Sequence, residues 1–168
     1  MDHFDRLGLP RRFSLDPAAL EREYLARSRA VHPDYHQLAS SAEQAASVEF
    51  SAAINEAYTT LKDPFKRAEY LQKLEGGPSA SELKDMPAEF LEEMLDLRTE
   101  IAGLTPDAPE AQAMEKQLRD RRDQMLGEVG RLLESLTTEN RPARLADARR
   151  RLNATKYVQN LIRDLRAL

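Results

Sequence analysis

The sequence has no cysteine, no tryptophan and no long apolar run. Without cysteine there are no disulfides, no zinc knuckles, no thiol nucleophile and no cysteine-held iron–sulfur cluster. A membrane span needs roughly 20 mostly apolar residues in a row, and the first ten residues lack the basic start and apolar core of a signal peptide. These absences favour a cytoplasmic protein with no membrane partner.

An excess of basic charge is also missing. The 168 residues include 25 Lys and Arg against 29 Asp and Glu, which gives a net charge of −4. The balance is even along the chain, with 10 − 12 = −2 for residues 1–75 and 15 − 17 = −2 for residues 76–168. General nucleic-acid binding requires a clearly basic face, so we expect no nucleic-acid partner.

The residues that are present predict an all-α protein. Ala, Leu, Glu and Arg dominate, and no stretch alternates apolar with polar residues over the length of a strand. Asp16 is the expected N-cap of a helix that begins at Pro17 and ends before Pro33, because a residue that precedes proline disfavours the α region. A second helix is expected from about Ser41 to the "KDP" motif, and a short third helix from Pro64 through residue 74. The second helix carries an apolar stripe that predicts its buried face: Ala46, Phe50, Ala53, Ile54, Ala57 and Leu61.

A change in composition divides the chain. Residues 76–86 and their flanks contain paired glycines, prolines and serines without periodicity, which is typical of a linker between residues 1–75 and 87–168. After it we expect helices over approximately 87–103, 107–138 and 141–167. Three amphipathic helices predict a C-terminal three-helix bundle.

The stretch "VHPDYH" lies between the first two long helices and places His32, Asp34 and His36 at every second position. A metal site requires three or four convergent ligands, and His3 is the only other histidine. A nucleophilic triad would need a serine beside a base and a glycine-rich elbow, and neither is evident. The residues alone leave three interpretations open: a docking surface, a metal-dependent hydrolase site, or a solvated helix end.

A longer pattern identifies a family. "HPD" followed by "INEAYTTLKDPFKRAEYL" resembles the J-domain of DnaJ-type co-chaperones, in which an antiparallel helix pair with short flanking helices carries His-Pro-Asp at its tip. "FDRLGLP", the Leu15, Asp16 and Leu20 opening, "RAEYL" and the C-terminal three-helix segment are similar to HscB-type co-chaperones of iron–sulfur cluster assembly. The resemblance implies an adaptor that is not an enzyme and holds no cofactor or metal.

This resemblance implies a DnaK/HscA-type chaperone as a partner, whose ATPase the loop stimulates. The residues expected to contact it are His32, Pro33 and Asp34 of the loop, together with Arg22 and Arg29 of the preceding helix. An exposed Asp34 can form a charge-assisted hydrogen bond with an arginine of the partner, and Pro33 limits the conformational entropy lost on docking.

The second implied partner is an IscU-type iron–sulfur scaffold. The helix expected over 87–103 has a core-facing stripe of Phe90, Met94, Leu97 and Ile101. Leu91 and Leu95 lie about 100° around the helix axis from this stripe. They form either an exposed patch or part of a wider buried stripe. "FLEEMLDLRTE" is similar to the scaffold-binding segment of the family, which implies contacts from Leu91, Leu95 and Asp96, and from Tyr157 of the last helix, with Ala154 as an alternative register.

Two other functions remain as alternatives. A general J-protein for unfolded clients would carry a Gly/Phe-rich linker, zinc modules or client-binding β domains, and the sequence has none of them. A metal-dependent hydrolase would use His32, Asp34 and His36. The absence of a transit peptide and of an N-terminal Cys-x-x-Cys domain suggests a bacterial origin.

Overall fold

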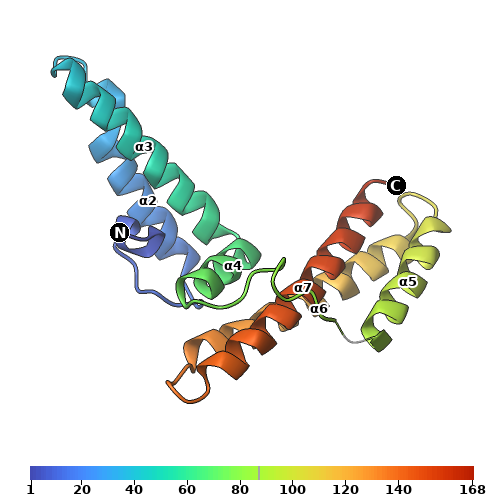
Figure 1. Ribbon diagram of the computed structural model, residues 1–168. Coiled ribbons are helices and arrows are strands. Elements are labelled where there is room, and N and C mark those ends of the chain that lie inside the picture. Colours follow the sequence, from blue (N-terminus) through green and yellow to red (C-terminus); the bar gives the residue numbers. More distant parts are fainter. Residues whose placement is uncertain (87) are drawn as a thin grey trace. The chain divides into compact units, whose positions relative to one another are not determined.

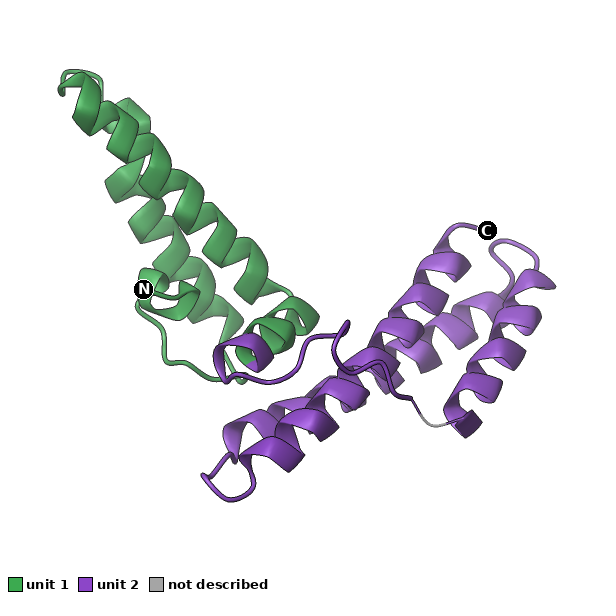
Figure 2. Cartoon of the chain, viewed as in Figure 1, with its two compact units in different colours: residues 1–71 green, residues 72–168 purple. Residues whose placement is uncertain are grey.

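All regular elements in the described part of the computed structural model, residues 1–86 and 88–168, are helical, which confirms the all-α prediction. In chain order these elements, shown in Figure 1, are α1 (His3–Leu7), α2 (Pro17–Val31), the 3₁₀ helix η1 (Pro33–His36), α3 (Ser41–Lys62), α4 (Pro64–Leu74), α5 (Ala88–Ala102), α6 (Pro109–Glu134) and α7 (Arg141–Arg166). The chain forms two compact units, residues 1–71 and 72–168 (Figure 2).

Unit 1 is built around α2 and α3, which lie side by side in opposite directions (Figure 1). The Asp16 side chain accepts the Ala18 N–H at 3.0 Å and caps α2, as predicted. Ser40 and Glu43 form a reciprocal capping box at the start of α3. Proline and capping residues therefore fix the ends of both helices and the position of the loop between them.

The core of unit 1 lies toward the end of the helix pair that is remote from this loop. Tyr24 stacks on Tyr58 with ring centroids 4.0 Å apart, and its hydroxyl donates to the Asn55 side chain at 2.8 Å. The buried apolar side chains come from α1, α2, α3 and α4: Phe4, Leu7, Leu20, Ile54, Ala57, Leu61, Ala68 and Leu71.

The apolar stripe predicted for α3 is wrong at Phe50. Its side chain is 57% exposed, although Ile54 one turn later is buried. Near the loop, the α2 residues on the same side of the pair are the small Ala30 and the β-branched Val31, the last residue of α2. No large side chain there covers the Phe50 ring.

The short helix α1 was not predicted from its own residues. Asp2 forms a capping box with Asp5, and Gly8 ends the helix with φ 64°, a left-handed conformation that favours glycine. A Cβ at Gly8 would lie 2.1 Å from a terminal nitrogen of Arg27. Arg27, which the sequence places on an apolar stripe, is half buried and packs its guanidinium over this glycine.

In unit 2, α6 and α7 form a long antiparallel pair, and α5 packs against the half that contains the carboxyl terminus (Figure 1). The expected three helices are present. α6 ends at Glu134 and not near residue 138, because the Ser135 hydroxyl donates back to the Arg131 carbonyl and the Asn140 side chain accepts the Thr137 N–H in the turn. The core that α5 shares with this half is formed by Met94, Ile101, Ala111, Leu118, Val158, Leu161, Ile162 and Leu165.

The expected linker, residues 76–86, lies in unit 2 and makes hydrogen bonds there; the expected start of the next helix, Pro87, lies outside the described residues. The amide of the buried Gln72 donates to the Leu145 carbonyl at 2.8 Å. Asn153 of α7 donates to the Leu83 carbonyl at 2.9 Å. These bonds attach the segment 72–83 to α7.

We expect alanine at two glycines of unit 2 to have opposite effects. A Cβ at Gly77 would lie 2.3 to 3.0 Å from the amide atoms of Gln72, which is held by Leu145, so Gly77→Ala should destabilise the unit by about 1–3 kcal/mol through a disrupted buried hydrogen bond. Gly127 lies inside α6 with its nearest contact at 3.7 Å, so Gly127→Ala should stabilise by about 0.5–1 kcal/mol. Thermal melting of both variants checks this, and shifts of the same sign would contradict the packing described.

Candidate functional site

The His-Pro-Asp loop forms a compact turn at the end of α2. Pro33 keeps His32 extended, with φ −63° and ψ 133°, and Tyr35 N–H donates to the His32 carbonyl at 3.1 Å. The His32 Nδ1 atom accepts the Asp34 N–H at 3.2 Å, so the neutral ring carries its proton on Nε2. The Asp34 side chain is 75% exposed. The backbone of the turn is thus satisfied locally, and the Asp34 carboxylate faces solvent.

Three side chains outside the triplet hold this turn in place. Two of them come from the first turns of α3, and the third follows Asp34 by two residues. Their hydrogen bonds are from Ser47 Oγ to the Val31 carbonyl (2.5 Å), from Gln44 Nε2 to the Gln37 carbonyl (2.8 Å) and from His36 Nε2 to the Ala30 carbonyl (3.2 Å). Sequence reasoning did not assign these roles; a serine on the otherwise apolar face of α3 was the available signal for Ser47.

Two of the three residues of the alternative hydrolase site lie close together, with His32 Nδ1 3.5 Å from Asp34 Oδ2, but His36 does not complete a set of three. His36 Nε2 is directed to the Ala30 carbonyl, where it must donate, and His32 Nδ1 accepts a backbone N–H. Over residues 1–86 and 88–168, no three His, Cys, Asp or Glu side chains are grouped so that they could hold a metal ion. The positions of His32, Asp34 and His36 are therefore explained by the turn itself.

The outer face of α2 carries both arginines expected to contact a chaperone. Arg22 and Arg29 are exposed and line a shallow hollow together with the partly exposed Leu25. Leu20, on the other side of the helix, is buried in the core. The prediction that these arginines lie opposite the core-facing residues is confirmed by this placement.

On α5, neighbouring residues differ sharply in exposure. Met94 is 1% exposed, whereas Leu95 is 59% exposed, and Asp96 is exposed as well. Leu91 is half buried, so only one of the two leftover leucines is freely accessible. The remaining residues of the predicted core-facing stripe, Phe90, Leu97 and Ile101, pack in or against the core as expected.

An ion pair fixes α5 on α6. Arg121 donates to both carboxylate oxygens of Glu93 at 2.5 and 2.9 Å, and its guanidinium lies 5.6 Å from the centroid of the Phe90 ring. The hydrogen bonds from Arg121 lower the pKa of Glu93 below its ordinary value. The stabilisation from this pair is therefore present at neutral pH and is lost as the pH falls through that lowered pKa.

On the last helix, the two residues considered for the aromatic contact differ in exposure. Tyr157 is half buried and packs against the core that α5 shares with α7. Ala154, the alternative, is buried. Of the two, Tyr157 is the side chain that reaches the surface.

Comparison with known proteins agrees with both units. The chain matches the family model described as "DnaJ domain" over residues 2–70 and the model described as "HSCB C-terminal oligomerisation domain" over residues 86–166. It is 37% identical to the co-chaperone protein HscB homolog of Bordetella petrii over 134 residues, which is 79% of each chain. It is 42% identical to the co-chaperone protein HscB of Proteus mirabilis over 102 residues, 60% of this chain and 59% of that protein.

Solved structures extend the similarity over nearly the whole chain. The chaperone HscB from Vibrio cholerae superposes with a TM-score of 0.84 at 28% identity, covering 99% of this chain and 96% of that one. Human co-chaperone protein HscB gives a TM-score of 0.86 at 25% identity, covering 99% and 81%.

Together the helix pair, its His-Pro-Asp tip and these matches define a J-domain co-chaperone. Within that class the chain belongs to the HscB family. This confirms the resemblance seen in the sequence, and also that the protein is not an enzyme, because the family is non-enzymatic. No helix within the described residues has the length and apolar character needed to span a membrane.

The contrast between two neighbours on α5 can be tested by stability alone. Met94→Ala should cost about 2–5 kcal/mol, because it removes a buried side chain and leaves a cavity. Leu95→Ala should stay within about 0.5 kcal/mol of the wild type, because its side chain is mostly exposed. Urea unfolding of the two variants measures the difference, and a large loss in Leu95→Ala would show that this leucine belongs to the core.

Proposed function

We propose that this protein binds an IscU-type iron–sulfur scaffold, delivers it to a DnaK/HscA-type chaperone and stimulates the ATPase of that chaperone during iron–sulfur cluster assembly and transfer. Membership of the HscB co-chaperone family supports the general role. The observation that carries the mechanism is the exposed Asp34 carboxylate, presented by a turn whose backbone bonds are made within the protein.

Stimulation requires the loop to hold a charged group in a fixed position. A charge-assisted hydrogen bond from Asp34 to an arginine of the chaperone is stronger than a bond between neutral groups. Because Pro33 and the His32 cap already order the turn, docking loses little conformational entropy. Arg22 and Arg29 add positive charge on the outer face of α2, which steers an acidic partner surface toward the loop. The ATP chemistry belongs entirely to the chaperone.

The proposed scaffold surface is on unit 2. Leu95 supplies exposed apolar area, Leu91 and Tyr157 are half buried and add partly accessible apolar area, and the exposed Asp96 adds a charge. Exposed apolar side chains surrounded by polar ones are typical of partner surfaces. No nucleic acid or membrane takes part in this proposal, and we place the protein in the bacterial cytoplasm on the basis of its bacterial relatives.

The chaperone-docking role makes a specific prediction about two exposed aspartates. Asp34→Asn removes one charge at nearly constant size, so it should abolish stimulation of the chaperone ATPase while helicity and scaffold binding stay intact. Asp96→Asn, the matched change in unit 2, should leave stimulation unchanged in the absence of scaffold. The measurement is steady-state ATP hydrolysis by the purified chaperone with each full-length variant. Wild-type stimulation by Asp34→Asn would refute the proposed role of the loop.

A further inference from the structure

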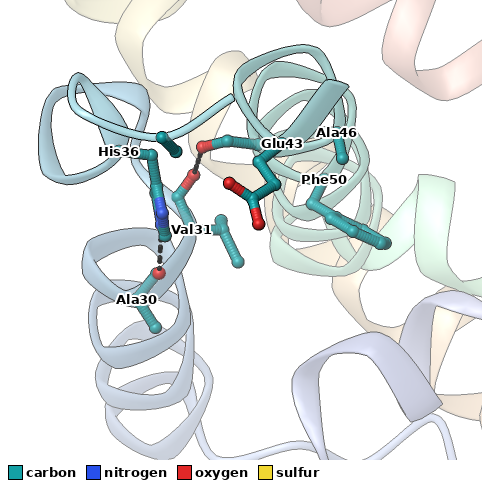
Figure 3. Close-up of a pocket in the computed structure, with 8 residues that line it drawn as sticks. Ala30, Val31, His36, Glu43, Ala46 and Phe50 are labelled. Carbon is teal, nitrogen blue, oxygen red and sulfur yellow. Dashed lines mark hydrogen bonds between the residues drawn. The ribbon is translucent and has the colours of Figure 1, made fainter. Parts of the chain in front are cut away.

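An open hollow lies directly beside the loop, between the end of α2 and the start of α3 (Figure 3). Its volume is about 390 Å³. Most of its wall is apolar and built from small side chains, with one large aromatic ring at the rim: Ala30, Val31, Ala39, Ala46 and Phe50, completed by His36, Glu43 and Ser47. The two residues of α2 that line it, Ala30 and Val31, are small or β-branched, and Phe50 at the rim is 57% exposed.

The polar groups of the hollow already have partners within the protein. His36 Nε2 donates to the Ala30 carbonyl, as Figure 3 shows, and Ser47 Oγ donates to the Val31 carbonyl. The Glu43 carboxylate accepts the Ser40 N–H at 3.0 Å. The rest of the wall is mostly apolar, so an apolar side chain fits it best.

We propose that this hollow receives an apolar side chain of the same chaperone that engages Asp34, with the Phe50 ring as its main contact. The inference rests on the proposed function and adds a second contact to it. His36 lines the hollow and follows Asp34 by two residues, so the two surfaces are continuous. A stable protein interface covers roughly 800 Å² on each partner, which is more than one turn provides. A chaperone docked on Asp34 therefore extends over neighbouring surface, and the hollow is the apolar part of it.

The chain offers a matched control for this proposal. Val48 is 56% exposed and Phe50 57% exposed, both on α3, but Val48 does not line the hollow. Side chains two residues apart on an α-helix are rotated by about 200° about the helix axis, so they lie on nearly opposite faces. Phe50→Ser and Val48→Ser thus remove comparably exposed apolar side chains from different faces of one helix, and neither change should affect folding much.

The test is a titration of each full-length variant into a purified DnaK/HscA-type chaperone while ATP hydrolysis is measured. Phe50→Ser should raise the concentration needed for half-maximal stimulation by roughly tenfold or more, as the loss of an interface anchor does. Val48→Ser should leave that concentration within about twofold, since scattered surface changes have small effects. Phe50→Leu, which keeps an apolar side chain, should restore most of the affinity. Circular dichroism melting confirms that each variant is folded.

The other outcomes separate this inference from the function on which it rests. If Phe50→Ser needs the same concentration as wild type for half-maximal stimulation while Asp34→Asn loses stimulation, the hollow is not a contact. The proposed role of the loop is then unaffected. Equal losses of affinity in Phe50→Ser and Val48→Ser would show that the contact is not located at the hollow. If Phe50→Ser instead abolishes self-association in sedimentation and leaves stimulation unchanged, the occupant is a second copy of this chain and the proposal is wrong. If Asp34→Asn also stimulates normally, the proposed function fails first.

Discussion

The restriction that Pro33 places on His32 determines the geometry of the end of unit 1 that carries the His-Pro-Asp loop. Because His32 cannot continue α2, it adopts an extended conformation and its ring accepts the Asp34 N–H. This closes a turn that directs the Asp34 carboxylate to solvent and returns the chain to α3. A residue that allowed α2 to continue would remove the turn, the exposed charge and the antiparallel pairing together.

The same end of unit 1 separates polar groups that build the turn from groups that remain available. Ser47, Gln44 and His36 all use their side chains to bind backbone carbonyls. Asp34 and Phe50 do not take part in these bonds and stay largely exposed. A carboxylate and an apolar ring presented by a rigid frame are suited to docking, because little order has to be gained when the partner binds.

Local chemistry explains which parts of the fold could be predicted from the sequence. Pro17, Pro33 and the capping residues act on their immediate neighbours, so the bounds of α2 and α3 follow from the residues themselves. Phe50 could not be placed correctly, because its exposure depends on the size of the side chains across the pair, which periodicity does not report. The attachment of the segment 72–83 to α7 was missed for a similar reason: its bonds are made by single side chains such as Gln72 and Asn153.

The candidate site shows the same limit. Helical spacing correctly separated the buried Met94 from the exposed Leu95, since a single helix alternates its faces regularly. It did not show that Leu91 is half buried, because this depends on how closely α5 approaches its neighbours. The resemblance to HscB supplied the expected roles of these residues, and the structure shows which of them are accessible.

The proposed function requires one chain to link a scaffold on α5 to a chaperone on the α2–α3 loop. The most direct measurement is the ATPase rate of the purified chaperone at a sub-saturating concentration of the full-length protein, with and without an IscU-type scaffold. If the proposed function is correct, adding scaffold increases the ATPase rate more in the presence of the wild-type protein than with the chaperone alone. Leu95→Ser should lose this additional increase and keep the stimulation seen without scaffold. An equal gain with wild type and Leu95→Ser, or no gain with either, would contradict this function.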